Sequence, residues 1–424
     1  MIILLFVFFL IIYSLRKLIK PFLMSPLWLF ISFHFTCIVF SYIYYYFVPL
    51  SKKINLFNVD RVTSTQFDEV IFYFLLSLVF FSLGALLNLF LLKKKYRRSL
   101  RQNLSKSLFL NIKLQSYFSW TINIVFVIII LLYMSVYGSE LFLRETYLGS
   151  EIASRHLSTL LKFLSLIEVV LLGIVFNNSP KKSLLMFVML VFLSLGTGSR
   201  ILVVYCIAYN AIVYINSRGG GTQTLRAVAG LFLTLILYAF VIEFRSQHRH
   251  GLYPYLLSVL GDGVNKGFVY NFLFNIYYAL IFGVFATVET LEKGVRDWGI
   301  IRASLSPLPG FMTDFYSYVP KLKLNQFAPF TYYGQVFLMG KTFSILFSFL
   351  SGCVFLRLEI YVRYFLVRGN KIFAFILSFF VFLQIIYSTQ YLLRSGVRYF
   401  YYLFIIIFLF KFISRVKFPK IRLR

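Results

Sequence analysis

Long apolar runs without charge, separated by short polar segments, dominate the pattern along the chain. A helix that crosses about 30 Å of hydrocarbon needs about 20 mostly apolar residues. Eleven runs, several of them shorter than this, are bounded by charged residues. They lie at 2–15, 27–48, 70–92, 117–137, 157–176, 184–195, 201–215, 227–244, 342–356, 372–392 and 399–410. The pattern predicts an all-α fold, a polytopic membrane helix bundle with about 11 transmembrane helices.

Lysine and arginine gather in alternate connections between these runs. One set holds 25 basic residues and a single acid, Glu359; its segments are 16–20, 93–113, 181–182, 218–226, 357–371 and 411–424. The other set holds 17 basic and 11 acidic residues; its segments are 49–69, 138–156, 196–200, 245–341 and 394–398. Because short loops rich in Lys and Arg stay in the cytoplasm, we expect the N-terminus outside and the C-terminus inside.

The run 268–288 has 21 residues without a charge and resembles a further span. A crossing there would move the basic segments after it to the outer side, against the charge rule. We therefore expect an interfacial or re-entrant helix inside one long extracytoplasmic loop. The predicted regions are 1–244 with eight spans, the loop 245–341, and 342–424 with three spans and a basic cytoplasmic tail.

Composition strengthens the membrane prediction. Hydrophobic residues make up 60% of the 424 residues and charged residues 13%, which excludes an ordinary soluble domain. The net charge of +29 requires anionic neighbours, for which membrane lipids suffice, and nothing indicates nucleic acid. Cys37, Cys206 and Cys353 lie in apolar runs without ligand spacing and so predict neither disulfides nor a zinc site. The first run lacks a basic leader and a cleavage site, so we expect a retained span.

A cluster of arginine and histidine opens the long loop directly after the eighth run. Arg245 and Arg249 offer guanidinium groups that hold phosphate, and His248 or His250 beside them can accept a proton near neutral pH. The alternative interpretation is a basic anchor that touches lipid headgroups.

Three more arginines fall in predicted outer connections. Arg200 ends a turn between two runs too short for a full crossing, and Arg394 and Arg398 lie in the last outer connection. With Arg245 and Arg249 they would form an outer vestibule that attracts anions, if their helices are neighbours. Arginines that only snorkel to the interface are the alternative.

The remaining candidates are carboxylates. Asp314, between turn-rich segments of the long loop, is a candidate general base or acceptor for a sugar hydroxyl, although an isolated loop Asp is more often only solvated. Glu168 lies near the middle of the fifth run, where a carboxylate is a functional candidate or neutralises an arginine from another helix. Asp60, Asp68 and Glu69 leave a metal site open, but acids this dispersed are usually solvated.

This layout and three short motifs resemble the Wzy-type polymerases of O-antigen and capsule repeat units, and more distantly the O-antigen ligases. The motifs are the turn 196–200, the segment 307–310, and the stretch from 330 to Gly340 that leads into the ninth run. By position, Arg200, Arg245 and Arg249 match the important outer arginines of the family. Some members have Arg and Gly with ten residues between them; here eleven separate Arg249 from Gly261.

The resemblance implies glycosyl transfer without metal or cofactor at the outer face of the bacterial cytoplasmic membrane. The substrates would be oligosaccharide repeat units on polyprenyl pyrophosphate, and a chain-length regulator protein is a candidate partner. Arg200, Arg245, Arg249, Arg394 and Arg398 would stabilise the leaving pyrophosphate. Candidate bases are, in falling order, His248, His250 and Asp314. A lipid-linked oligosaccharide flippase or other transporter, a ligase, and a metal-dependent lipid-sugar glycosyltransferase remain alternative functions.

Overall fold

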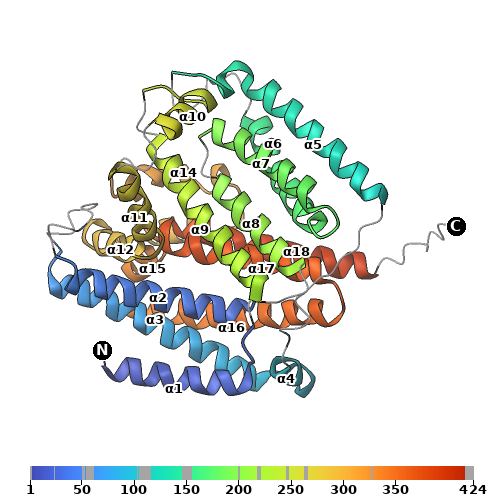
Figure 1. Ribbon diagram of the computed structural model, residues 1–424. Coiled ribbons are helices and arrows are strands. Elements are labelled where there is room, and N and C mark those ends of the chain that lie inside the picture. The colour runs from blue at the N-terminus through green and yellow to red at the C-terminus, as the bar shows by residue number, and fades with distance from the viewer. Residues whose placement is uncertain are drawn as a thin grey trace. The chain divides into compact units, whose positions relative to one another are not determined.

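The structure, a computed structural model, is built from helices (Figure 1). It describes residues 2–22, 24–49, 53, 62–102, 104, 116–145, 155–198, 201–216, 221–244, 248–261, 266–325 and 328–415. Within these ranges the chain forms no β-strand, only the isolated bridges Arg144–His250 and Lys323–Pro329. The prediction of an all-α fold is confirmed for the described part of the chain.

The α-helices, in chain order, are α1 (Ile2–Leu18), α2 (Pro26–Phe47), α3 (Ser64–Leu91), α4 (Lys94–Arg101), α5 (Ser116–Tyr137), α6 (Arg155–Val175), α7 (Pro180–Gly196), α8 (Ile201–Asn216), α9 (Gly221–Phe244), α10 (Leu252–Gly261), α11 (Lys266–Leu280), α12 (Phe282–Lys293), α13 (Trp298–Leu305), α14 (Phe315–Tyr318), α15 (Tyr332–Leu338), α16 (Lys341–Val367), α17 (Lys371–Gln390) and α18 (Leu393–Arg415). Short 3₁₀ turns are η4 (Gly138–Leu141), η5 (Gly310–Met312) and η6 (Val319–Leu322).

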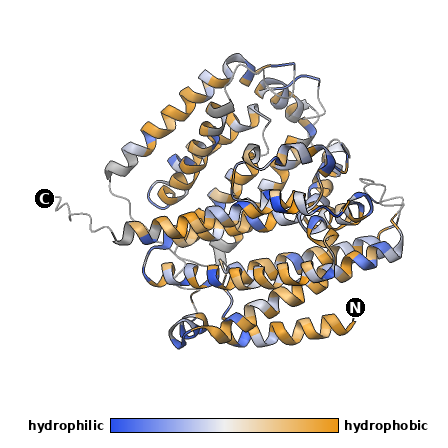
Figure 2. Cartoon of the chain, turned by 180° about the vertical axis from the view of Figure 1, so that it is seen from behind, coloured by the Kyte–Doolittle hydropathy of each residue, from blue (hydrophilic) through white to orange (hydrophobic). Residues whose placement is uncertain are grey.

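Five helices in the described ranges are long and apolar enough to cross a membrane, or six if a bent pair counts as one span. The five are Pro26–Phe47, Ser64–Leu91, Trp120–Leu141, Lys341–Val367 and Phe373–Gln390. Hydrophobic residues cover most of the length of the long helices (Figure 2). This is the make-up of a helical membrane protein. The count of about 11 spans is not reached, partly because α1 and α7 have 17 residues each.

The chain divides into two compact units. The first comprises 1–107 and 277–424, and the second comprises 108–276. The regions 1–244, 245–341 and 342–424 were drawn from membrane topology, which compactness does not measure, so they stay a prediction.

In the first unit, α3 and α16 lie side by side (Figure 1) and pack at glycines. A Cβ on Gly352 would lie 1.9 Å from the carbonyl oxygen of Phe81, and one on Gly84 would lie 2.1 Å from that of Phe349. Asn88 adds a hydrogen bond of 3.1 Å to the carbonyl of Cys353. Small residues at such a crossing let two backbones approach closely, as membrane helices require.

The far end of α16 differs from the predicted inner loop 357–371, because the helix continues to Val367. Glu359 and Arg363 are both fully buried there, with Arg363 Nε donating to Glu359 Oε1 at 2.7 Å. Ser25 Oγ donates to the other carboxylate oxygen at 2.5 Å. Since a buried charge is tolerated when it is paired and hydrogen-bonded, these residues do not end the helix.

The uncharged run 268–288 is broken between two helices. α11 and α12 meet at a bend of 62°, the geometry of a broken span or of a re-entrant loop. At the bend, Gly283 of α12 lies close to α17, since a Cβ there would be 2.2 Å from the carbonyl oxygen of Thr389. α12 also packs against α2, α3 and α15. Hydropathy along the chain does not detect this bend, so on hydropathy alone the run resembles one straight span.

The second unit contains α5 to α10. α6 packs against α5, α7 and α8, and α8 packs against α9. Two connecting segments of this unit meet at the bridge of Arg144 with His250, which is closed by two backbone hydrogen bonds of 2.8 Å. Glu168 on α6 is fully buried, and within the described ranges neither of its carboxylate oxygens has a hydrogen-bond partner.

Candidate functional site

The short helix α15 is almost completely buried and fixes one wall of a pocket in the first unit. Its N-cap, Thr331, accepts a hydrogen bond of 2.9 Å from the backbone nitrogen of Gly334. The Thr331 hydroxyl also bonds that of Thr287 on α12 at 2.7 Å, and its backbone nitrogen donates to Thr290 at 3.3 Å. A Cβ on Gly334 would lie 2.6 Å from Thr290 Cγ2, so glycine allows α15 to rest on α12.

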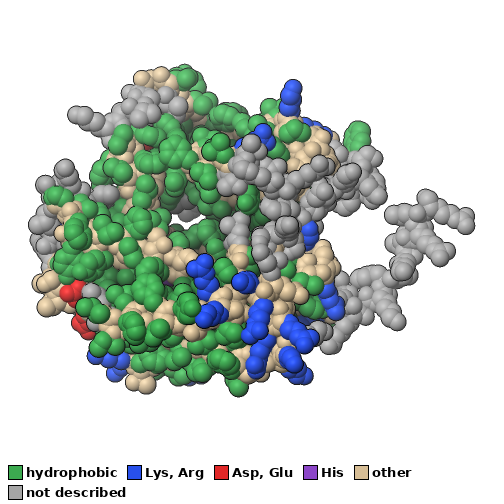
Figure 3. All heavy atoms as spheres, turned by 60° about the horizontal axis from the view of Figure 1, so that its bottom comes forward, with side chains coloured by type: hydrophobic (Ala, Val, Ile, Leu, Met, Phe, Trp, Pro, Cys, Tyr) green, Lys and Arg blue, Asp and Glu red, His purple; other side chains and the backbone are tan. Residues whose placement is uncertain are grey.

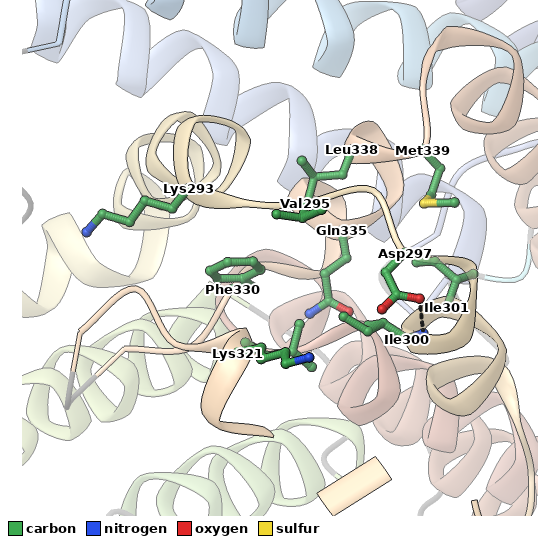
Figure 4. Close-up of a pocket in the computed structure, with 11 residues that line it drawn as sticks. Lys293, Val295, Asp297, Ile300, Ile301, Lys321, Phe330, Gln335, Leu338 and Met339 are labelled. Atoms are coloured by element: carbon green, nitrogen blue, oxygen red, sulfur yellow. Dashed lines mark hydrogen bonds between the residues drawn. The ribbon is translucent and has the colours of Figure 1, made fainter. Parts of the chain in front are cut away.

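Gln335 follows on α15 and points into the pocket (Figure 4). Its side chain is 1% exposed, and within the described part of the chain neither the amide nitrogen nor the amide oxygen has a hydrogen-bond partner. Buried polar atoms in folded proteins are nearly always paired, and an unpaired one costs about 1–3 kcal/mol. A buried amide held in this state by its neighbours is therefore placed to meet a polar ligand.

The pocket has a volume of about 400 Å³, within the range of roughly 300–1,000 Å³ that small-molecule sites occupy. It lies between the end of α12, α13, η6 and α15. Its lining residues are Lys293, Val295, Asp297, Ile300, Ile301, Lys321, Leu322, Phe330, Gln335, Leu338 and Met339. All of them belong to the segment 245–341, where the sequence predicts the chemistry.

Asp297 and Lys321 bring opposite charges to this pocket, and Figure 4 shows both reaching toward the part that Gln335 faces. Asp297 caps α13: its Oδ1 accepts hydrogen bonds from the backbone nitrogens of Gly299 at 2.7 Å and Ile300 at 3.4 Å. Those bonds fix the orientation of the carboxylate. Lys321 is exposed at the mouth.

Two further basic residues frame the pocket without pointing into it. Lys293 extends away from Gln335 in Figure 4, pairs with Glu289, and donates to the carbonyl of Leu324 at 3.2 Å. Arg296 donates to the carbonyl of Met339 and so satisfies the C-terminal end of α15. These contacts hold the walls together.

The polar groups of the pocket suit a ligand that carries hydroxyls. The Gln335 amide offers two donors and an acceptor, an ionised Asp297 offers acceptors only, and Lys321 offers donors with a positive charge. Apolar side chains such as Val295, Ile300 and Leu338 form the rest of the wall. A sugar presents both hydroxyls and apolar C–H faces, so this mixture fits a saccharide with an anionic group.

The predicted Arg–His cluster lies in the second unit. Arg200 and Arg245 fall outside the described residues. His248 and Arg249 are exposed. These four positions keep their predicted roles as predictions.

His250, by contrast, is buried, and its Nδ1 lies 3.1 Å from the hydroxyl of Tyr255. Burial, and to a lesser degree the positive charge of Arg144, lower the pKa of His250. The ring is therefore neutral at pH 7, as a base must be. The backbone of His250 forms the bridge with Arg144, and the Arg144 guanidinium donates to the carbonyls of Glu140 and Gly196.

The last predicted connection, 394–398, is helical, because α18 begins at Leu393. Arg394 is 2% exposed and donates to the backbone carbonyls of Ala303 and Leu308. Its guanidinium carbon also lies 4.7 Å from the ring centre of Phe315. Arg394 thus ties α18 to α13 and to the turn after it, whereas Arg398 is exposed.

The described carboxylate candidates of the first unit have separate surroundings. Asp314 is exposed and adopts a left-handed backbone conformation with φ of 49°. Asp68 accepts a hydrogen bond of 2.9 Å from the Tyr46 hydroxyl, and Asp60 lies outside the described residues. In the ranges that are described, no three His, Cys, Asp or Glu side chains are grouped as metal ligands would be.

No protein-family model, no curated protein and no solved structure matches this chain. The resemblance to repeat-unit polymerases therefore stands on the motifs of the sequence alone, and the function that it implies is a proposal.

The sequence pattern alone predicts a role for neither Gln335 nor Asp297, although Gln335 lies in the stretch that resembles the family. A signal for Asp297 is present, since an Asp directly before an apolar helical segment, here Trp298–Leu305, is a typical N-cap. No comparable signal exists for Gln335. Its importance depends on burial by α12, which a linear pattern does not reveal.

Proposed function

We propose that the chain is a membrane glycosyltransferase that polymerises polyprenyl-pyrophosphate-linked oligosaccharide repeat units into a surface polysaccharide, O-antigen or capsule. The reaction would take place at the outer face of the bacterial cytoplasmic membrane. The observation that carries this proposal is the buried, unpaired amide of Gln335 in a pocket of the long loop, beside a carboxylate and a lysine. The motif that resembles the family contains that same residue.

In this proposal the pocket holds the glycan of one repeat unit. Gln335 exchanges hydrogen bonds with sugar hydroxyls, Asp297 accepts one from a hydroxyl and orients it, and Lys321 stands near the anionic end. Correct placement of two reactants supplies a large part of a barrier reduction, which is why a rigid pocket matters.

The chemical step breaks the bond between C1 of the donor sugar and the pyrophosphate oxygen. An acceptor hydroxyl oxygen forms the new bond to C1, its proton passes to a base, and polyprenyl pyrophosphate leaves. Arginines stabilise the departing negative charge. The base candidates are those predicted from the sequence, and the lowered pKa of His250 keeps that ring neutral. Of the predicted arginines, Arg394 is set aside because it is buried and donates to backbone carbonyls. The proposal keeps Arg200, Arg245, Arg249 and Arg398.

The charge distribution of the first unit is compatible with the outward placement of the pocket. In Figure 3 the acidic side chains of the visible face lie at its left with some Lys or Arg beside them, and a larger group of Lys and Arg lies toward the lower right, where α4 lies in Figure 1. The α3 end with Asp68 and Glu69 is near Glu292, because Gln66 donates to Glu292. The pocket lies in the segment that follows Glu292, so it lies toward this end of α3 and not toward the basic helix α4, and the charge rule predicts this end outside.

The test is the pool of lipid-linked glycans in a deletion strain that carries plasmid copies of the gene. The deletion strain with an empty plasmid should accumulate lipid-linked single repeat units at the outer face of the membrane. The wild-type copy should restore the ladder of polymers of increasing length. Gln335→Leu should leave single units, while Lys323→Gln, which removes an exposed charge of the same loop outside the pocket lining, should restore the ladder. Single units stranded inside the cell would instead show a flippase, and a full ladder with Gln335→Leu would remove the pocket from the reaction.

A further inference from the structure

A second pocket, of about 380 Å³, is lined by four basic side chains of the short helix α4. They are Lys94, Arg97, Arg98 and Arg101. Their spacing of three, four and seven residues from the first puts all four on one face of the helix. Like charges this close on a helix repel and destabilise it. A chain that builds such a face needs an anion on it.

The position of α4 relative to the hydrophobic spans is fixed. The candidate span α3 ends at Leu91, and α4 begins three residues later, so with α3 across a membrane its basic face would stand at the depth of lipid headgroups. Arg97 also reaches back, donating to the carbonyl of Leu92 at 3.0 Å and to that of Phe90. The pocket thus begins where the hydrocarbon ends.

The opposite face of α4 is anchored to the core of the first unit. Leu100 is fully buried, and its carbonyl accepts a hydrogen bond of 3.0 Å from the backbone nitrogen of Lys20. Arg363, which is paired with Glu359, donates to the carbonyls of Ser99 at 3.3 Å and Gln102 at 3.1 Å. α4 is therefore held before any ligand arrives, which reduces the entropy that binding costs.

The surroundings of the pocket indicate an amphiphile as its ligand. Leu91 is 82% exposed and Phe90 is 55% exposed, and both lie in the last turn of α3 directly before the basic helix. A free anion would use only the guanidinium and ammonium groups. A lipid would place its phosphate among them and its acyl chains against these exposed apolar side chains.

We propose that the α4 pocket is a specific site for the phosphate headgroup of an anionic membrane phospholipid. Arg98 and Arg101 bind the phosphate oxygens, Lys94 adds charge, and Arg97 connects the site to the end of α3. This site is separate from the glycan pocket and does not depend on the proposed reaction.

The test uses the purified full chain in nanodiscs of phosphatidylcholine that contain phosphatidylglycerol, with the lipids retained after detergent release counted by native mass spectrometry. The wild type should retain phosphatidylglycerol at least tenfold over phosphatidylcholine. Arg98→Gln combined with Arg101→Gln should remove this preference. The matched control, Arg16→Gln combined with Lys17→Gln on exposed positions of α1, should keep it within twofold.

Two results would overturn the proposal. Equal loss in the double variant and in the α1 control would mean that a diffuse basic surface, not the pocket, attracts the lipid. Retention of phosphatidylglycerol at the wild-type level by the double variant would mean that the pocket does not hold the lipid headgroup. All the substituted side chains are exposed, so a thermal melt that matches the wild type checks the fold in each variant.

Discussion

Among single residues, Gln335 tests whether the pocket is a ligand site or only part of the packed core, because the two cases predict different effects of its substitution on the melting temperature. An unpaired buried amide lowers the stability of the fold, and replacing it by an apolar residue of similar shape is neutral or stabilising. We therefore expect Gln335→Leu to melt at the same temperature as the wild type or higher. A lower melting temperature would mean that the amide has a structural partner, and the pocket would lose its best argument.

His250 makes stability depend on pH. Its pKa lies below the usual 6.5 in the folded chain, so the unfolded chain binds the proton more readily. The contribution of His250 is complete above pH 6.5 and is lost as the pH falls through that value toward the folded pKa. Melting curves from pH 7.5 to 5.5 should show a smaller decline for His250→Asn than for the wild type. The exposed His248→Asn should decline like the wild type; an equal slope in all three would contradict the assignment.

Arg394 and Arg398 allow a structural role to be separated from a phosphate-binding role, which the sequence does not distinguish. Arg394→Ala removes two hydrogen bonds to backbone carbonyls and should cost about 1–3 kcal/mol of unfolding free energy. Arg398→Ala, at an exposed position, should change it by less than about 0.5 kcal/mol. Chemical denaturation in detergent measures both. If Arg394→Ala abolished polymer without loss of stability, Arg394 would be a phosphate ligand as predicted from the sequence.

At the scale of helices, the crossing of α3 and α16 is the closest contact of the first unit that the glycines reveal. Gly352→Ala would put a methyl group 1.9 Å from a backbone oxygen of α3, so the helices must separate. Overpacking of this kind costs about 1–3 kcal/mol. Leu350→Ala, on an exposed position of the same helix, is the control. Equal melting temperatures for both variants would contradict this packing.

The sequence predicted helices well and their ends less well. The run 70–92 coincides with most of α3 because few polar residues interrupt it, but α3 begins earlier, at Ser64, where Thr63 and Gln66 form a capping box. For α16 the pattern predicts an end before Arg357, because Arg357, Glu359 and Arg363 indicate an inner loop, whereas the helix continues to Val367. Their pairing with each other and with Asn88 of α3 is tertiary, and hydropathy along the chain does not contain it.

The candidate site shows the same limit. Composition and the predicted long loop direct attention to the segment 245–341, and the resemblance does so for the stretch before Gly340; the pocket lies in this segment. The convergence of Asp297, Lys321 and Gln335 needed the fold, because α12, α13, η6 and α15 meet only in three dimensions.

At the scale of the whole molecule, the charge rule makes a prediction about the two ends of α3. The acidic end with Asp68 should lie outside and the basic end with α4 inside. A membrane-impermeant maleimide should label Thr65→Cys in intact cells, and should label Arg101→Cys only after permeabilisation. Both positions are exposed. The reverse labelling pattern would mean that the topology is opposite to the one predicted and that the glycan pocket faces the cytoplasm.

The central claim is that the Gln335 pocket binds the glycan of a lipid-linked repeat unit. The most direct measurement is the dissociation constant of purified lipid-linked repeat unit for the full chain in nanodiscs, compared between the wild type, Gln335→Leu and Lys323→Gln. The account predicts at least tenfold weaker binding for Gln335→Leu, about 1.4 kcal/mol, and unchanged binding for Lys323→Gln. Equal affinity in all three proteins would contradict it.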